Sequence, residues 1–436
     1  MFKVAELTVP PESPLQSLKL LTTMPNALSE NLQACRLCET SSMEDILDVT
    51  TQPPANSLRR SGEPAPPKIP LMLCRCTACG TVQLTETVDP EYLFSHYVWV
   101  TGTSAAAHGY AREFAQKILS RVPAGRRKVL EVASNDGTFL KPFLSQGHEV
   151  VGVDPAANIA KTANDAGILT YPRFFGADTA GDVVGKHGLF DVVFARNVLP
   201  HVKDPNSVVA GMVAALDPAG LLAIEFHRAD IILEELHYDS IYHEHLFYHS
   251  LASMERLTGS HGLHVFDVTT SPISGGSYVA YFSRQPRDPS AALLQARKHE
   301  ERLGIQSSDA WRRFARRCTE HRDSLRSVVL ELAAEGKKII GFGASARSST
   351  LLNFTGLDGK VITCIADNNP LKESRLTPGT DIPIVKSRDA FGTKPDVVLL
   401  LAWNFEKEIL EEIKTVHGWT GIVVAPLPGP PRRIQI

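Results

Sequence analysis

The chain has 436 residues, a formal net charge of −3 and a hydrophobic content of 43%. This length is enough for two or three domains, and the slightly acidic balance gives no electrostatic footprint for nucleic acid. No run approaches the ~18 to 20 apolar residues of a membrane span, and the N-terminus lacks the basic-then-apolar pattern of a secretory signal. We therefore expect a cytoplasmic protein that binds neither nucleic acid nor a membrane.

Cysteines are concentrated in the first segment of the chain, where five of the seven fall between Cys35 and Cys79. Cys35 and Cys38 form one CxxC pair, and Cys76 and Cys79 form another. Four thiolates brought together in this way bind Zn²⁺ tetrahedrally and leave no open coordination position, so the metal should stabilise the fold rather than catalyse. Cys74 is a less favoured alternative to Cys76. We expect an N-terminal extension and a zinc-binding domain within residues 1–90.

The second segment, residues 91–285, opens with a pattern typical of nucleotide-binding folds. An apolar strand reaches Glu131 and Val132 and runs into the turn Ala133-Ser134-Asn135-Asp136-Gly137, and the next strand ends at Asp154. A carboxylate about 20 residues downstream can accept both hydrogens of a ribose diol. A loop that binds a pyrophosphate would have three glycines, so the single Gly137 favours S-adenosylmethionine over a nicotinamide cofactor. The candidate cofactor-binding residues are Glu131, Ala133, Asn135, Asp136, Gly137, Asp154 and Asn197.

Two polar groups follow later strands of this segment. Short apolar strands at 190–195 and 220–225 indicate a doubly wound parallel sheet, in which ligands collect at the carboxyl ends of strands. Asn197 and His201 follow the first strand, and Tyr242-His243-Glu244-His245 follows the second after a short helix. A phenol, two imidazoles and a carboxylate in four positions can move protons. We expect both groups to face one pocket, with His243 turned away if its segment is extended.

The third segment, residues 286–436, begins with a charged helical stretch near 290–335 that predicts a solvated helix or hairpin. It then repeats a strand and glycine loop, Ile339-Ile340-Gly341-Phe342-Gly343, followed by a strand that ends near Asp367. This pattern predicts a second nucleotide-type fold. One alternative is a decayed fold that binds no nucleotide and only encloses the site. Another is a nicotinamide oxidoreductase that uses this loop.

With these residues assembled, the chain resembles the sugar C-methyltransferases of deoxysugar pathways, which methylate carbon 3 of a nucleotide-linked 4-keto-deoxyhexose. The resemblance covers roughly residues 32–430. The family's Glu-Ile-Gly-Ser-Asn-Asp-Gly is matched at 131–137 apart from Ala133, its Asn-Val-Leu-x-His at 197–201, and its Tyr-His-Glu-His at 242–245. The family's Gly-x-Gly-Ala-x-Ala-Lys-Gly-Asn-Thr-Leu-Leu-Asn is matched at 341–353, except for Arg347, Ser348 and Ser349. Its Asp-x-Asn-Pro-x-Lys and Pro-Gly-Thr have close counterparts at 367–372 and 378–380.

The resemblance implies an α/β protein with an N-terminal zinc-binding domain, a central doubly wound, Rossmann-like methyltransferase domain and a second, C-terminal Rossmann-like domain. It assigns the general base to His245, which removes the proton beside the ketone. Glu244 is expected to orient that imidazole or to hold a sugar hydroxyl. The candidate donors to the carbonyl oxygen are Tyr242, Asn197, His201 and Tyr97. The candidate contacts to the nucleotide sugar are Arg347, Asn353, Asn368 and Lys372.

Two other functions stay open at this point. A methyltransferase of the same build would act on another ketone or on a hydroxyl, which the altered residues Arg347 to Ser349 suggest. A zinc-ribbon protein would only bind nucleic acid or sense a metabolite. The absence of a basic stripe argues against nucleic acid, and a sensor needs no base such as His245. We expect a small-molecule partner and a monomer or small homo-oligomer.

Overall fold

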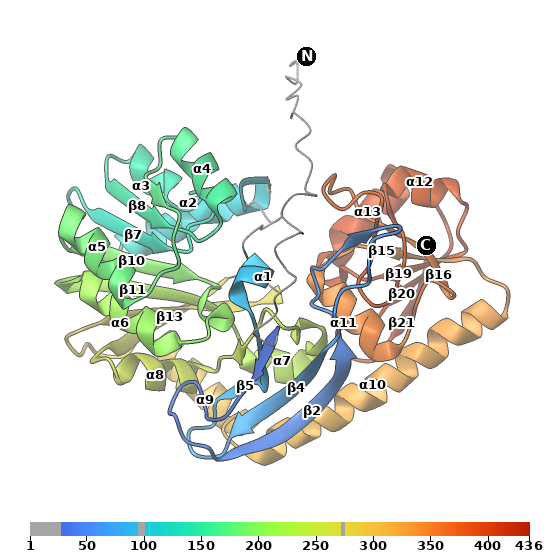
Figure 1. Ribbon diagram of the computed structural model, residues 1–436, viewed down its shortest axis with the longest axis horizontal. Helices are drawn as coiled ribbons and strands as arrows, with labels where there is room; N and C mark the ends of the chain where they lie inside the picture. Colours follow the sequence, from blue (N-terminus) through green and yellow to red (C-terminus); the bar gives the residue numbers. More distant parts are fainter. Residues whose placement is uncertain (1–27, 95–100, 104, 272–274) are drawn as a thin grey trace.

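Two large sheets lie at opposite ends of the molecule, and a smaller N-terminal sheet and a long helix run between them (Figure 1). The computed structural model describes residues 28–94, 101–103, 105–271 and 275–436, so Tyr97 lies outside the described residues. Within these ranges, no helix combines the length and the apolar character needed to cross a bilayer.

The second segment forms a seven-stranded sheet in the order β13-β14-β11-β10-β7-β8-β9. Its neighbouring strands pair in parallel except where β14 meets β11 and β13. The central strands are apolar on both faces because helices cover both sides, as the sequence predicts. The strands are β7 Lys128–Val132, β8 Glu149–Val153, β9 Thr170–Tyr171, β10 Phe190–Arg196, β11 Leu216–His227, β13 His264–Ser271 and β14 Ser277–Ser283. The helices are α2 Ala105–Leu119, α3 Lys141–Ser145, α4 Ala157–Asp165, α5 Ala177–His187, α6 Pro205–Ala215, α7 Ala229–Glu235 and α8 Leu251–Gly259.

The third segment contains a six-stranded sheet in the order β18-β16-β15-β19-β20-β21, parallel except for the pairing of β20 with β21. This arrangement agrees with the predicted second nucleotide-type fold. Its strands are β15 Ile339–Phe342, β16 Ile362–Ala366, β18 Ile384–Val385, β19 Val397–Leu400, β20 Ile422–Ala425 and β21 Arg432–Gln435. Its helices are α11 Ala346–Thr355, α12 Ser387–Gly392 and α13 Glu406–Thr415.

The N-terminal segment pairs with both of the larger parts. Its antiparallel sheet has the order β12-β5-β4-β2, in which β12 Phe247–Tyr248 comes from the second segment. The other members are β2 Met43–Gln52, β4 Ile69–Cys76 and β5 Val82–Leu84. A two-residue strand, β3 Arg59–Arg60, pairs with β17 Arg375–Leu376 of the third segment. Strands β1 Ser29–Asn31 and β6 Glu86–Val88 pair with each other, and helix α1 spans Pro90–Phe94.

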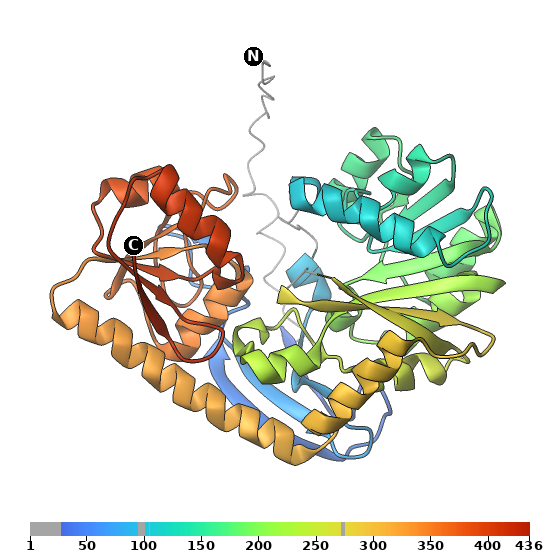
Figure 2. The same cartoon turned by 180° about the vertical axis from the view of Figure 1, so that it is seen from behind.

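The charged stretch near 290–335 forms two helices, α9 Ala291–Leu303 and α10 Ser308–Ala334, and is only partly solvated. Helix α9 packs against β13 and α8, whereas α10 runs along β2 (Figures 1 and 2). Trp311 and Phe314 of α10 are buried in the same apolar cluster as Leu71 of β4 and the C-terminal sheet. The apolar residues of α10 therefore recur on one face, which the high density of charges hides in the sequence.

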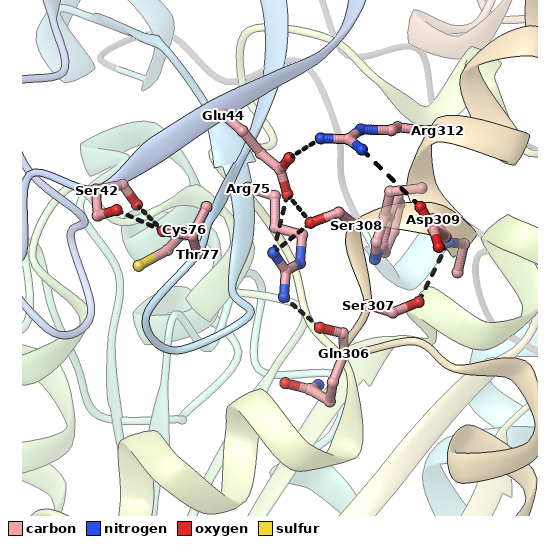
Figure 3. A network of polar contacts seen from close by, with 12 residues as sticks. Ser42, Glu44, Arg75, Cys76, Thr77, Gln306, Ser307, Ser308, Asp309 and Arg312 are labelled. Carbon is pink, nitrogen blue, oxygen red and sulfur yellow. Dashed lines mark hydrogen bonds and ion pairs between the residues drawn. The ribbon is translucent and has the colours of Figure 1, made fainter.

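A polar network fixes the start of α10 to the N-terminal sheet (Figure 3). Glu44 on β2 accepts hydrogen bonds from Arg75 on β4 at 2.9 Å, from Arg312 at 2.9 Å and from Ser308. Arg75 also donates to the carbonyl oxygen of Gln306. The Arg75 and Glu44 side chains are only 7% and 15% exposed, so this ion pair is better shielded from water than a surface pair.

Candidate functional site

The four cysteines of the two CxxC pairs converge on one point. The sulfur atoms of Cys35 and Cys79 are 3.7 Å apart, those of Cys38 and Cys76 are 3.6 Å apart, and all four lie within 4.8 Å of one another. A Zn²⁺ ion about 2.3 Å from each thiolate would place the sulfurs about 3.8 Å apart. The residues therefore fit a structural zinc ion. Cys74 is buried but does not belong to the converging group.

The turn after β7 adopts an unusual backbone. Ala133, Asn135 and Gly137 have positive φ angles of 55°, 49° and 75°. At Gly137 a Cβ atom would also lie 2.6 Å from the Cδ1 atom of Ile168, so this position has no room for a side chain. Asp154 holds the turn, because its carboxylate accepts hydrogen bonds from the backbone N–H of Asn135 at 2.8 Å and of Ala156 at 3.0 Å.

A short segment lies across this turn. The side chain of Asn135 accepts a hydrogen bond from the N–H of Thr101 at 2.9 Å, and Asp136 accepts one from Gly102 at 3.1 Å. Thr101 and Gly102 belong to a 3₁₀ turn, η2 Thr101–Thr103, just before α2. The predicted cofactor residues of the turn therefore lie beside Asp154, at the carboxyl ends of β7 and β8, whereas Asn197 follows β10. Asn135, Asp136 and Asp154 make the hydrogen bonds that shape the loop.

Glu131 at the end of β7 is suited to a ligand that carries hydrogen-bond donors. Its side chain is buried, its Oε2 atom has no hydrogen-bond partner among the described residues, and burial raises the pKa of its carboxyl well above the ordinary value. A buried acceptor without a partner is costly. The hydroxyl and ammonium groups of S-adenosylmethionine are donors of the required kind, so the loop fits that cofactor.

His245 is held in one tautomer by its neighbours. Its Nδ1 atom lies 3.0 Å from the carbonyl oxygen of Ser240, which only accepts hydrogen bonds, so Nδ1 carries the proton. The Nε2 atom then offers a lone pair, and the Tyr242 hydroxyl donates to it at 2.8 Å. The two rings are 4.1 Å apart between centroids. This arrangement presents a neutral imidazole whose basic nitrogen faces a phenol.

The group that contains Asn197 and His201 lies against the group that contains His245, as the sequence predicts. His201 lies in the 3₁₀ turn η3 Leu199–His201 and donates from Nδ1 to the carbonyl oxygen of Glu244 at 2.6 Å. The rings of His201 and His245 are 4.7 Å apart. Asn197, in the left-handed conformation with φ 51°, lines a small cavity together with His245 and His227.

Burial makes both imidazoles weakly basic. It lowers the pKa of His201 to about 4, because no carboxylate compensates the desolvated cation. It also lowers the pKa of His245 well below 6.5, and the nearby His201, His227 and Arg347 lower it further. Both rings are therefore neutral near pH 7, which is the state that a base requires.

Glu244 and His243 point in different directions from the same turn. Glu244 is 3% exposed and its Oε1 atom accepts a hydrogen bond from Asn56 at 3.1 Å, whereas its Oε2 atom has no partner among the described residues. The Nε2 atom of His243 lies 3.2 Å from the carbonyl oxygens of Ile69 and Pro70. His243 thus points away, but residues 242–244 form a turn and not the extended segment considered above.

The four C-terminal candidates are engaged within the protein. Arg347 makes two hydrogen bonds to Asp239, at 3.0 and 2.7 Å, and its guanidinium lies 4.7 Å from the ring centre of Trp403. Lys372 donates to the carbonyl oxygen of Ala344 at 2.8 Å. Asn353 donates to the carbonyl oxygen of Pro378 at 3.0 Å, and Asn368 accepts from Ser387 at 2.7 Å. Their interpretation as contacts to a nucleotide sugar stays a prediction.

Three features of the site had no signal in the sequence. The Ser240 carbonyl that sets the tautomer of His245 is a backbone atom, Asn56 lies 188 positions from Glu244, and Asp239 binds Arg347 across 108 positions. Charge complementarity favours a partner for each buried charge but does not identify it.

Three family models match consecutive parts of the chain. Residues 35–94 match a model described as "Putative zinc binding domain", residues 106–268 match "Methyltransferase domain", and residues 272–428 match "C-methyltransferase C-terminal domain".

Among characterised proteins, the chain is 33% identical to C-methyltransferase NovU of Streptomyces niveus over 404 residues, which are 92% of this chain and 96% of that protein. It is 28% identical to a ubiquinone biosynthesis O-methyltransferase of Rhodopseudomonas palustris (strain BisA53) over 33% of this chain and 62% of that protein. The crystal structure of magnesium protoporphyrin IX methyltransferase from Synechocystis PCC 6803 covers 41% of this chain and 79% of its own, with a TM-score of 0.32 and 12% identity.

Proposed function

Because the chain belongs to the S-adenosylmethionine-dependent C-methyltransferases, we propose that it methylates carbon 3, beside the ketone, of a nucleotide-linked 4-keto-deoxyhexose. The observation that carries this proposal is the geometry of His245. A carbon next to a ketone attacks a methyl group only after losing its proton, and His245 combines a fixed tautomer with a half-buried, neutral ring.

In the proposed reaction the C–H bond beside the ketone breaks and the proton passes to Nε2 of His245. The electron pair of that bond moves into the enolate, with negative charge on the former carbonyl oxygen. The Tyr242 hydroxyl, which now donates to Nε2, turns toward that oxygen when the base is used. Asn197 is another donor within the same site. His201, predicted as a donor from the sequence, uses its one ring N–H on the carbonyl oxygen of Glu244, so its Nε2 atom can only accept a hydrogen bond.

S-adenosylmethionine supplies an electrophilic methyl group when it is bound. Glu131 would accept hydrogen bonds from it and Asp154 would bind the ribose, while Ala133, Asn135, Asp136 and Gly137 shape the loop beneath it. The neutral state of His245 suits a site that must also hold the positive sulfonium, since a second cation there would be unfavourable.

We also propose a division of labour along the chain. Residues 1–90 bind zinc, residues 91–285 bind the methyl donor, and residues 286–436 contribute to the binding of the acceptor. The pairing of β12 with β5, and of β17 with β3, supports contacts between the parts that a shared substrate would need.

The test is mass spectrometry of a panel of thymidine-diphospho-4-keto-deoxyhexoses incubated with the protein in heavy water. We expect a product one methyl group heavier with S-adenosylmethionine, and deuterium at the carbon beside the ketone without it. His245→Gln should abolish both signals while calorimetry still detects donor binding.

His243→Gln is the matched control, because His243 lies in the same turn and points away. It should retain both signals. If the wild type, folded and loaded with zinc, gives neither signal, the acceptor is another ketone or a hydroxyl compound. Loss of donor binding in His245→Gln would contradict the role proposed for that residue.

A further inference from the structure

The N-terminal segment reaches the turn that contains His245. Asn56 lies between β2 and β3, and its Nδ2 atom donates to Oε1 of Glu244 at 3.1 Å. Asn56 is exposed, whereas Glu244 is buried and lies next to His245 in the sequence. An exposed amide therefore holds a buried carboxylate from the outer side of the site.

The segment that carries Asn56, residues 53–58, is itself fixed; we call it the strap. Pro53 to Ala55 are buried, and the N–H of Ser57 donates to the carbonyl oxygen of Pro54 at 3.0 Å. Pro53 lies so close to Gly379 that a Cβ atom there would be 3.0 Å from its Cδ atom. Just beyond the strap, Arg59 forms an ion pair of 2.9 Å with Asp381.

Asn353 and Pro378, matched to the sugar C-methyltransferases above, belong to this contact. The Asn353 side chain donates to Pro378 at 3.0 Å, and its Oδ1 atom would clash with a Cβ atom added to Gly379. Gly379 has a φ of 79°, which a residue with a side chain adopts only at a cost. These C-terminal residues thus form the surface on which the strap rests.

Glu244 is left with one oxygen satisfied and one without a partner. Its Oε2 atom is buried and makes no hydrogen bond to a described residue. A buried carboxylate oxygen in this state is unfavourable until a donor reaches it. A hydroxyl group is such a donor, and a hexose carries hydroxyls on carbons near its ketone.

We propose that Asn56 is a positioning residue for the methyl transfer: it holds one oxygen of Glu244 so that the other binds a hydroxyl group of the acceptor sugar. This inference rests on the proposed function, because it requires an acceptor that carries a hydroxyl. Asn56 acts through Glu244, and the strap supplies it from the zinc-binding segment.

The experiment is a double-mutant cycle measured on the keto-sugar that the wild type methylates. Asn56→Ala removes the donor and should lower kcat/KM about 10-fold, mainly through KM. Asn56→Asp places two acceptors face to face and should lower it more. In Asn56→Asp/Glu244→Gln the roles are exchanged, because the introduced amide donates to the introduced carboxylate and turns its own oxygen toward the substrate. The double variant should be at least as active as Glu244→Gln alone.

Controls separate positioning from folding. Ser57→Ala changes the neighbouring strap residue and should leave kcat/KM unchanged, and each variant should remain folded, with a cooperative thermal unfolding transition, and keep its donor binding. Full activity of Asn56→Ala, or effects that simply add in the double variant, would overturn the inference and leave the proposed function intact. A wild type that methylates no keto-sugar in the panel overturns the proposed function, and the inference with it.

Discussion

At the scale of single residues, the surroundings of His245 determine what its ring can do. The Ser240 carbonyl fixes the proton on Nδ1, and burial keeps the ring neutral. An exposed histidine would be partly protonated near its ordinary pKa of about 6.5, and the protonated fraction could not accept a proton. His245 is half-buried, and the Tyr242 hydroxyl lies at its Nε2 lone pair.

The pH dependence of the reaction should report this environment. The competent form of His245 is the neutral one, which prevails above its pKa. Because burial lowers that pKa well below 6.5, we expect kcat to stay flat from about pH 8 to about pH 6 and to fall only in more acidic buffer. The measurement is kcat at saturating substrate across this range. An acid limb at or above about pH 6.5, the ordinary value for histidine, would contradict the assignment of His245 as the base.

The free energy of unfolding must be measured in the same buffers, because it is also expected to decrease as the pH falls. The half-buried His201 has its pKa lowered to about 4 by desolvation, whereas the unfolded chain binds a proton near 6.5. Between these values the unfolded state holds more protons, so the free energy of unfolding decreases as the pH falls through this window. Circular dichroism at each pH distinguishes loss of the fold from protonation of the base.

Some of the site could be predicted at this scale and some could not. Tyr242, Glu244 and His245 were identified because they are adjacent in the sequence, and His201 because it follows a strand of the same sheet. Asn56 was missed because an isolated asparagine in a proline-rich connection indicates only a turn. Tyr97 lies outside the described residues, and its role stays a prediction.

At the scale of elements, a two-residue strand, β12, connects the zinc-binding segment to the turn of His245. Strand β12 begins two residues after His245 and pairs with β5, which starts three residues after Cys79. On this path Gln83 of β5 donates a hydrogen bond to the sulfur of Cys35 at 3.1 Å. A change at the cysteines is therefore transmitted to the turn of His245 through one pair of strands.

Removal of the metal should consequently impair catalysis, although the zinc site contains no reacting group. Cys79→Ser replaces one thiolate with a weak ligand, and we expect loss of bound zinc, a lower unfolding midpoint and a methylation rate reduced at least about 10-fold. Elemental analysis, thermal unfolding and the methylation assay measure the three quantities. Cys364→Ser is the matched control, because Cys364 lies on β16 far along the chain and outside the converging group. A zinc-free variant with full activity would contradict this coupling.

The elements themselves were largely predictable. Strands β7, β8, β10 and β15 were recognised because buried parallel strands are apolar on both faces. The pairings of β12 with β5 and of β17 with β3 were not, because strands of two or three residues carry no periodicity. The buried face of α10 was also missed, since charged residues dominate its composition.

At the scale of the whole molecule, the N-terminal segment belongs to two cores. Cys35, Cys76 and Cys79 lie in the apolar cluster of the seven-stranded sheet, whereas Leu47 and Leu71 lie in the cluster of the six-stranded sheet. Figures 1 and 2 show why: the strands β2 and β4 run between the two larger parts alongside α10. The zinc-binding segment thus fixes the relative position of the two folds that enclose the proposed site.

An ion pair between Asp239 and Arg347 is a further connection between these folds. Asp239 is 1% exposed and lies in the 3₁₀ turn η4 Tyr238–Ser240, next to the Ser240 carbonyl that holds His245. It accepts two hydrogen bonds from Arg347 on α11 and one from Trp403, at 2.7 Å, in the 3₁₀ turn η6 Trp403–Phe405. The planar fork of arginine suits this bidentate contact, whereas lysine, expected here from the family, would make it as a point charge.

Breaking this ion pair should loosen the molecule as a whole. Asp239→Asn removes the buried negative charge to which Arg347 makes its two hydrogen bonds, and we expect the free energy of unfolding to decrease by about 3 kcal/mol. Arg347→Lys keeps the charge but loses the second hydrogen bond, so a smaller loss of about 1 to 2 kcal/mol should follow. Urea titration measures both values. Asp165→Asn is the control, because its pair with Lys161 is exposed and should contribute less than about 1 kcal/mol. Equal stability of Asp239→Asn and the wild type would mean that the two folds are held together by their apolar contacts alone, and that Arg347 is available to the substrate.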